Sequence, residues 1–242
     1  AEDRSSVTGT ETWQFRFTVS IKPSVTLCTP TVQQGSVAAV RVGSTMSRTE
    51  PTLTGPLEST GFVRAANGWI CYLPIPWNAE TGNTELTVTA DGYTETLTLS
   101  VRAASYSYKD YSAKSQLTSP YIGADDAPDA VRRLLTTDGG EIQWAVGGFV
   151  QPFLDSFDTP LLYGMTEYVG RSYSERSTNY GYGGRTSTNV VIKPKKSKDS
   201  MIVPASGHVL LAEDLGGSYG CTVVIDHGAG LRSIFYGLTA LD

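Results

Sequence analysis

The side chains that could carry catalysis are few, and their spacing does not fit a common catalytic arrangement. The only two histidines in the 242 residues, His208 and His227, lack the spacing of a metal-binding pair. Asp226 directly precedes His227, and neighbouring residues of a strand point to opposite faces. The one Gly-x-Ser-x-Gly string, at 216–220, precedes an apolar run, whereas a nucleophile elbow follows a strand and opens a helix. We therefore interpret His227 as a turn or packing residue, His208 as exposed and 216–220 as a hairpin turn.

Three carboxylates, Asp125, Asp126 and Asp129, cluster around a proline. Asp is a common N-cap, proline is favoured in the first turn of a helix, and acidic groups are stabilised near the positive end of the helix dipole. A partly apolar run follows at 130–135, and Asp-Gly-Gly at 138–140 is typical of a helix end. The cluster therefore predicts a short helix rather than acid–base chemistry.

The stretch 163–184 is rich in Gly, Ser and Tyr and has no sustained period, which predicts a long loop over a scaffold. Its tyrosines could offer aromatic faces to a glycan, a peptide or a protein, because tyrosine buries a large area at low entropic cost. The same composition also describes an ordinary strand connector. The one basic run, at 193–198, is either a solvated loop or a contact for an anionic partner or wall polymer.

The bulk composition restricts the class of partner. The net charge is −5 and no region carries a broad basic face, so we expect no nucleic acid partner. No apolar run approaches the roughly 20 residues that span a bilayer, so membrane attachment would need an anchor that is not present in this chain. The polar start at 1–6 suits a mature or trimmed product. Three cysteines make no complete disulfide framework; we expect free thiols, and a Cys28–Cys71 bridge remains open.

The periodicity of the chain predicts a mainly β protein. Apolar and polar residues alternate at 13–21 and again at 94–101, and the turn pair Asp91-Gly92 precedes the second run. Several such strands predict an Ig-like antiparallel β-sandwich. The expected parts are a β-sandwich module at 1–103, a connector with one short helix at 104–146 and an antiparallel β domain at 147–242.

Four stretches of the second half follow the order of one family's motifs. They are Gly-Phe-Val-Gln-Pro at 148–152, Tyr163-Gly164, Val-Pro-Ala-Ser-Gly-His-Val at 203–209, and the strand–turn–strand run at 219–238. In these motifs the chain resembles the lysostaphin/LytM-type peptidases, zinc enzymes that cut the peptide cross-bridges of bacterial peptidoglycan. The resemblance implies a LytM-like antiparallel β domain and an extracytoplasmic, cell-envelope location. The sandwich and helix upstream resemble the N-terminal module of some secreted members.

The chain departs from this family at the positions that carry its chemistry. The family holds zinc with a His and an Asp four residues apart and with a His from a later His-x-His strand. Ser187 stands where that first His belongs, Asn189 where a Gly belongs, Val191 where the Asp belongs and Leu238 where a further His belongs. A valine cannot ligate zinc, and a neutral hydroxyl is a poor ligand. The His-x-His strand would lie beyond Asp242, so we expect a degenerate, truncated domain whose sheet has an open edge.

The resemblance and these departures together imply a pseudo-peptidase without a cofactor. We expect a binding or scaffold module of the cell envelope, with an envelope protein or peptidoglycan as its partner. Two alternatives remain: a zinc endopeptidase whose ligands lie outside this sequence, and a structural surface protein whose domains are spacers. The candidate binding groove comprises Tyr163, Tyr180, Tyr182, Arg185, Ser187, His227 and Tyr236.

Overall fold

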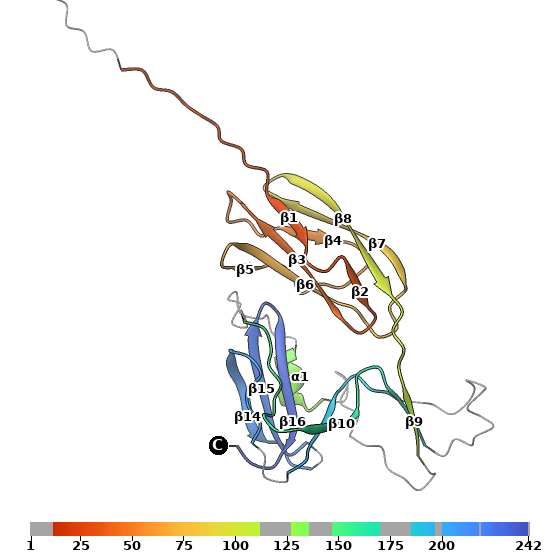
Figure 1. The fold of residues 1–242 in the computed structure, drawn as a ribbon. Helices are drawn as coiled ribbons and strands as arrows, with labels where there is room; N and C mark the ends of the chain where they lie inside the picture. The colour runs from red at the N-terminus through yellow and green to blue at the C-terminus, as the bar shows by residue number, and fades with distance from the viewer. Residues whose placement is uncertain are drawn as a thin grey trace, which may run out of the picture.

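The protein is mainly β, as the sequence predicts. The computed structural model describes residues 12–111, 127–135, 147–169, 185–196, 200–217 and 219–241. Figure 1 shows a β-sandwich in the first half, smaller sheets and a helix in the second half, and an extended arm that leads into the sandwich. No helix among the described residues is long and apolar enough to cross a membrane.

Two four-stranded sheets form the sandwich. The first has the order β1-β3-β6-β5, with β1 at Ser24–Leu27, β3 at Val37–Gly43, β6 at Gly68–Pro74 and β5 at Val63–Ala65. The second has the order β2-β8-β7-β4, with β2 at Thr31–Gln33, β8 at Tyr93–Arg102, β7 at Gly82–Ala90 and β4 at Thr52–Thr54. All pairs are antiparallel except β2 with β8, which is parallel, so the sandwich is not purely antiparallel.

The apolar faces of the two sheets meet in one core. Val40 and Leu73 from the first sheet and Leu86, Val88 and Leu99 from the second are fully buried there. Each such side chain contributes about 1.5–3 kcal/mol by leaving water. The Cys71 thiol is also in this core, and burial raises its pKa. All three cysteines are free thiols.

The predicted turn Asp91-Gly92 joins β7 to β8. Both residues have positive φ, 49° and 81°, and Ala90 lies opposite Tyr93, as in the two-residue turns that match strand twist. The Asp91 carboxylate accepts hydrogen bonds from the Ser47 amide at 3.3 Å and the Met46 amide at 2.6 Å. Hydrogen bonding to Ser47 and Met46 lowers the pKa of Asp91.

The prediction of a sandwich strand at 13–21 is wrong. Residues 12–23 are extended but belong to no strand, and the first sheet begins at β1. Alternation identifies a segment with one apolar face, but it does not show that a facing sheet exists in the same chain. Here the face stays exposed: Phe17 retains 85% of its accessible surface.

Beyond the sandwich, the described residues form three small sheets. The first has the order β12-β11-β9, with β12 at Arg185–Thr186, β11 at Thr166–Val169 and β9 at Tyr108–Tyr111. In the second, β10 at Phe157–Leu161 pairs with β13 at Val191–Pro194. The third has the order β14-β15-β16, with β14 at His208–Asp214, β15 at Cys221–Gly228 and β16 at Leu231–Leu238. The strand β9 falls where the sequence suggested a connector, and it pairs with β11 in parallel.

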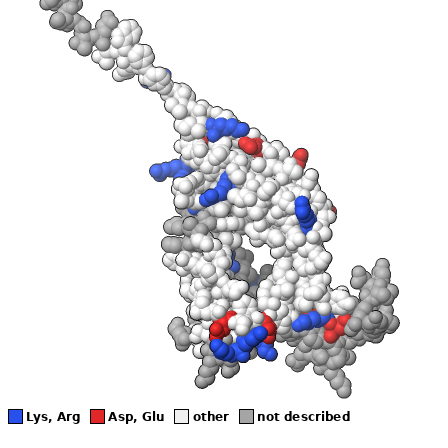
Figure 2. Space-filling view, in the orientation of Figure 1, with Lys and Arg blue, Asp and Glu red and all other residues white. Residues whose placement is uncertain are grey.

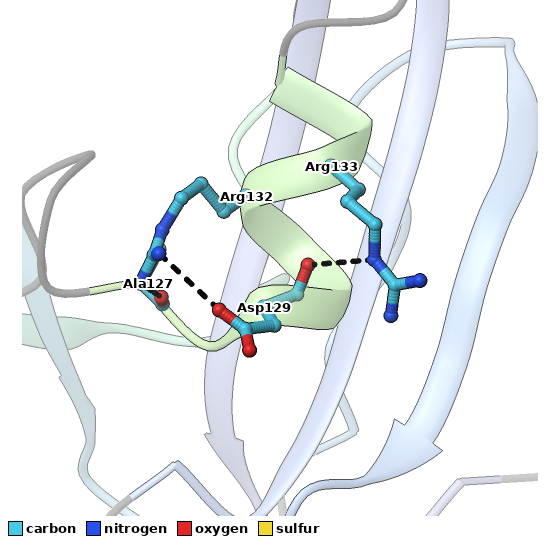
Figure 3. Close-up of polar contacts among 4 residues, drawn as sticks. All are labelled: Ala127, Asp129, Arg132 and Arg133. Carbon is cyan, nitrogen blue, oxygen red and sulfur yellow. Dashed lines mark hydrogen bonds and ion pairs between the residues drawn. The ribbon is translucent and has the colours of Figure 1, made fainter.

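The predicted helix is present as α1, Asp129–Leu135. The Pro128 carbonyl accepts the Arg132 amide at 2.8 Å, which begins the helical hydrogen bonds. The Arg132 guanidinium donates to the Ala127 carbonyl at 2.9 Å and pairs with the Asp129 carboxylate at 3.2 Å. Figure 3 shows these residues around the first turn of the helix. The expected caps at Asp125, Asp126 and 138–140 lie outside the described residues.

The hairpin of β15 and β16 is also as predicted. Ala229 and Gly230 form its turn with φ of 57° and 74°. One face of the hairpin packs on α1, where Val224 meets Val131 in a second buried cluster. The opposite face carries Ile225, which lies opposite Ser233 in the register.

Candidate functional site

Ser187 and Val191, which occupy the expected zinc-ligand positions, lie in a ribbon of antiparallel segments. Val191 on β13 lies opposite Leu161 on β10. The Ser187 amide donates to the Met165 carbonyl at 2.8 Å, and the Ser187 carbonyl accepts the Gly164 amide at 2.8 Å. The ribbon therefore brings Ser187 beside the Tyr163-Gly164 turn.

The Ser187 side chain closes a local turn. Its hydroxyl donates to the Asn189 carbonyl at 2.9 Å and accepts the Asn189 amide at 3.1 Å, and Ser187 is buried. Serine commonly makes such side chain–backbone turns. The turn separates β12 from β13, so residues 187 and 191 do not stand on one continuous strand. Both the donor and an acceptor site of the hydroxyl are engaged.

His227 is fully buried on β15, in agreement with its interpretation as a packing residue. Its Nδ1 lies 2.7 Å from the Ser206 carbonyl, and its Nε2 lies 2.8 Å from Ser233 Oγ. The carbonyl can only accept, so Nδ1 carries a proton, and in the neutral ring Nε2 accepts from the Ser233 hydroxyl. The Phe149 ring packs edge-on against the imidazole with centroids 4.9 Å apart. Both ring nitrogens are therefore committed within the fold.

Tyr236 does not share a surface with His227. Tyr236 packs with Val131 of α1 and Val224 of β15, on the face of the hairpin that the helix covers. His227 instead meets Phe149, which lies outside that cluster. Tyr236 also contacts Tyr219 at 5.7 Å between centroids, and burial, with a smaller effect of Tyr219, raises the pKa of the Tyr236 phenol.

Tyr163 lies at a contact between the two halves of the chain. A methyl group on Gly35, in the β2–β3 turn, would lie 3.2 Å from the Tyr163 ring and 2.4 Å from the Tyr106 hydroxyl. The Tyr106 ring also lies against Gly164 and meets Trp77 edge-on, with ring centroids 6.5 Å apart. Tyr106 thus packs between the sandwich and the Tyr163-Gly164 turn.

The Tyr106 hydroxyl is buried and has no hydrogen-bond partner among the described residues. Burial, with a further contribution from nearby Tyr163, raises the pKa of this phenol. Sequence reasoning missed Tyr106 because its role depends on two glycines distant in the sequence. The hairpin tip supplies another contact between the halves, since Gly230 lies close to Thr60.

Several residues of the predicted groove are not placed. Tyr180 and Tyr182 lie outside the described residues, and only the backbone of Arg185 is described. Of the others, Tyr163 and Ser187 come together, whereas His227 and Tyr236 belong to the separate β14-β15-β16 sheet. The membership of the groove stays a prediction.

The residues present do not fit a zinc ion at the expected positions. Val191 offers no ligand atom, and the Ser187 hydroxyl, a poor zinc ligand when neutral, is already held in two hydrogen bonds with Asn189. Among the described residues, no three His, Cys, Asp or Glu side chains gather closely enough to hold a metal.

The comparison with known proteins gives a weak likeness to solved structures. No family model matches the chain, and no curated protein matches it. Among solved structures, the chain is similar to a crystal structure from Pseudomonas aeruginosa described as a "putative peptidase M23". The two share 20% identity with a TM-score of 0.46, over 89% of this chain and 77% of that one. A likeness of this degree does not assign a family to the chain.

Proposed function

We propose that the second half of this chain is a LytM-like domain without hydrolytic activity that binds a wall component or a partner protein in the cell envelope. The four ordered motifs support the LytM likeness, and the hairpin that carries the longest of them is formed by β15 and β16. The main support for the absence of hydrolytic activity is the turn that Ser187 closes with Asn189. In that turn the side chain at the family's metal-binding position makes hydrogen bonds to the backbone instead.

The sheet beside Ser187 offers a surface suited to a glycan or peptide. Tyr108 on β9 and Tyr168 on β11 meet edge-on with ring centroids 6.3 Å apart, and Tyr108 retains 54% of its accessible surface. Both strands belong to the sheet that includes β12, which leads directly into Ser187. Tyrosines so placed combine an apolar face with a polar hydroxyl, which suits amphipathic ligands such as peptidoglycan.

The test is co-sedimentation of the full chain with purified peptidoglycan, with simultaneous measurement of soluble fragments released in the presence of zinc. We expect the protein to pellet with the wall and to release no fragments. Tyr108→Ala should weaken pelleting, whereas Tyr93→Ala, which alters a partly exposed tyrosine of the sandwich, should not. Zinc-dependent release would overturn the non-catalytic proposal. If the protein did not pellet, binding to a wall component would be ruled out and binding to a partner protein would be the part of the proposal that remains. A pull-down from envelope extracts with the same two variants tests that part.

A further inference from the structure

The arm that precedes the sandwich carries a continuous apolar face that the described part of the chain does not cover. Five alternating side chains retain about half or more of their accessible surface: Trp13 74%, Phe15 73%, Phe17 85%, Val19 62% and Ile21 48%. Phe15 and Phe17 stack on each other at 6.4 Å, which places aromatic rings side by side in solvent. Figure 2 shows this segment as largely uncharged. Large exposed apolar patches mark interaction sites.

The arm has the pattern of an inner strand of this very sandwich. Thr-Glu-Thr at 10–12 precedes the alternating arm residues, and Thr-Glu-Thr at 94–96 precedes Leu97, Leu99 and Val101 in β8. Leu99 and Val101 are buried between the two sheets. A segment with the same alternation needs a sheet to pair with and to cover its apolar face.

The sandwich of the same chain does not supply that sheet. The last residues of the arm contact β8: Ser20 Oγ lies 2.5 Å from Tyr93 Oη, and Lys22 forms an ion pair with Glu95 at 3.4 Å. Instead of pairing with the edge strand β4, the arm leaves an open cavity of about 690 Å³ lined by Val19, Ile21, Met46 and Thr52, among others. Figure 1 shows that the arm then runs out from the sandwich, away from the sheets of the second half.

A matching open edge lies in the second half of the fold. The outer strands of the two sandwich sheets have three or four residues each, whereas β14 has seven and β16 has eight. No strand of the described residues pairs with the outer side of β14. All but one residue of β14 is exposed, including Val209 at 60% and Leu210 at 37%, whereas most of β16 is half-buried. An exposed apolar edge of this length is a template for a further strand.

We infer that residues 13–21 form a β-strand by pairing with the edge of β14 in a second copy of this chain. An antiparallel register over the part of β14 that follows its bulge at Val209–Leu211 sets Phe17 opposite Ala212 and Arg16 opposite Glu213. Apolar pairs and an opposite-charge pair across strands both stabilise a sheet. Because the arm points away from its own β14, the acceptor is another molecule. Each copy offers one donor and one acceptor, so addition is head-to-tail and gives a reciprocal dimer or an open chain.

The test is light scattering after size exclusion on the full chain over a range of concentrations. We expect concentration-dependent self-association, weakened about tenfold or more by the double variant F15E/F17E, since tenfold corresponds to the loss of one or two good contacts. The matched control Q14E/T18E adds the same charge on the polar face and should leave association nearly unchanged. Val209→Lys on β14 should weaken it as the arm variant does.

A second measurement separates loss of pairing from loss of folding. F15E/F17E keeps its own β14, so it should bind a labelled peptide of residues 12–22, and Val209→Lys should not. A wild-type chain that is monomeric at every concentration and does not bind the peptide would overturn the inference. So would self-association that survives F15E/F17E, or that depends on the arm but not on β14. If the arm instead bound phospholipid vesicles and the chain stayed monomeric, a membrane would be the occupant and the inference would fail.

Discussion

Tyr106 offers a quantitative test of how the two halves of the chain are joined. Its hydroxyl points at Gly35, where an added Cβ would lie 2.4 Å away. Gly35→Ala therefore carries two costs. At φ of +77° an alanine costs about 1–2 kcal/mol in backbone strain, and forcing a methyl group against the phenol costs about 1–3 kcal/mol more. The expected loss of unfolding free energy is about 2–5 kcal/mol.

A matched glycine isolates the steric part of this cost. Gly92 has φ of +81°, and a Cβ there would meet nothing within 4 Å, so Gly92→Ala should cost only about 1–2 kcal/mol. Tyr106→Phe removes the atom that collides. Because the Tyr106 hydroxyl is buried without a partner among the described residues, this change alone should stabilise the protein by about 1 kcal/mol. In the double variant, most of the steric cost of Gly35→Ala should disappear.

The assay is urea unfolding of the full chain, followed by tryptophan fluorescence, for the four members of the double-mutant cycle and Gly92→Ala. Contacting residues give coupling energies of about 0.5–3 kcal/mol, and we expect a value in that range at this site. If Gly35→Ala cost no more unfolding free energy than Gly92→Ala, Tyr106 would not be packed against Gly35 as described. The same conclusion would follow if the cost of Gly35→Ala were equal with Phe and with Tyr at position 106.

Three further predictions follow from the described contacts. The pKa of Asp91 is lowered in the folded protein, so the ionised carboxylate stabilises the fold above pH 3.8, and this stabilisation is lost as the pH falls through the folded pKa. The unfolding free energy of the wild type should therefore fall more in acid than that of Asp91→Asn, and parallel curves of unfolding free energy against pH would contradict this. A thiol reagent at neutral pH should label the exposed Cys28 quickly and the buried Cys71 only on unfolding, as followed by mass spectrometry. Equal labelling rates would contradict the burial of Cys71 in the sandwich core. His227→Ala should lower the unfolding free energy by about 2–4 kcal/mol, because it opens a cavity and leaves the Ser206 carbonyl and the Ser233 hydroxyl without their hydrogen-bond partner. A loss in urea unfolding smaller than that of Ser233→Ala would show that the imidazole is not packed as described.

Two local features of the structure were predictable from neighbouring residues. The hairpin turn at Asp91-Gly92 and the helix after Pro128 follow from turn and capping preferences that act within a few residues. The alternating arm at 13–21 has the same local signature as β8, yet only β8 lies in a sheet. Pairing is a long-range property, so periodicity alone could not separate these two segments.

The candidate site was harder to foresee for the same reason. Sequence comparison with the LytM motifs identified Ser187 and Val191, but not that the Ser187 hydroxyl closes a turn on Asn189. Tyr236 and His227 lie in one motif, and the bulge between Asp226 and Gly228 disturbs the alternation from which their faces would be read. The strand β9 has only four residues, too few for a period to be recognised.

The most direct test of the non-catalytic proposal is the zinc content of the full chain after saturation with zinc and exhaustive dialysis, measured by elemental analysis. Because Val191 offers no ligand atom and the Ser187 hydroxyl is hydrogen-bonded to Asn189, we predict no stoichiometric zinc. One zinc per chain that survives dialysis and is lost in Ser187→Ala would contradict it.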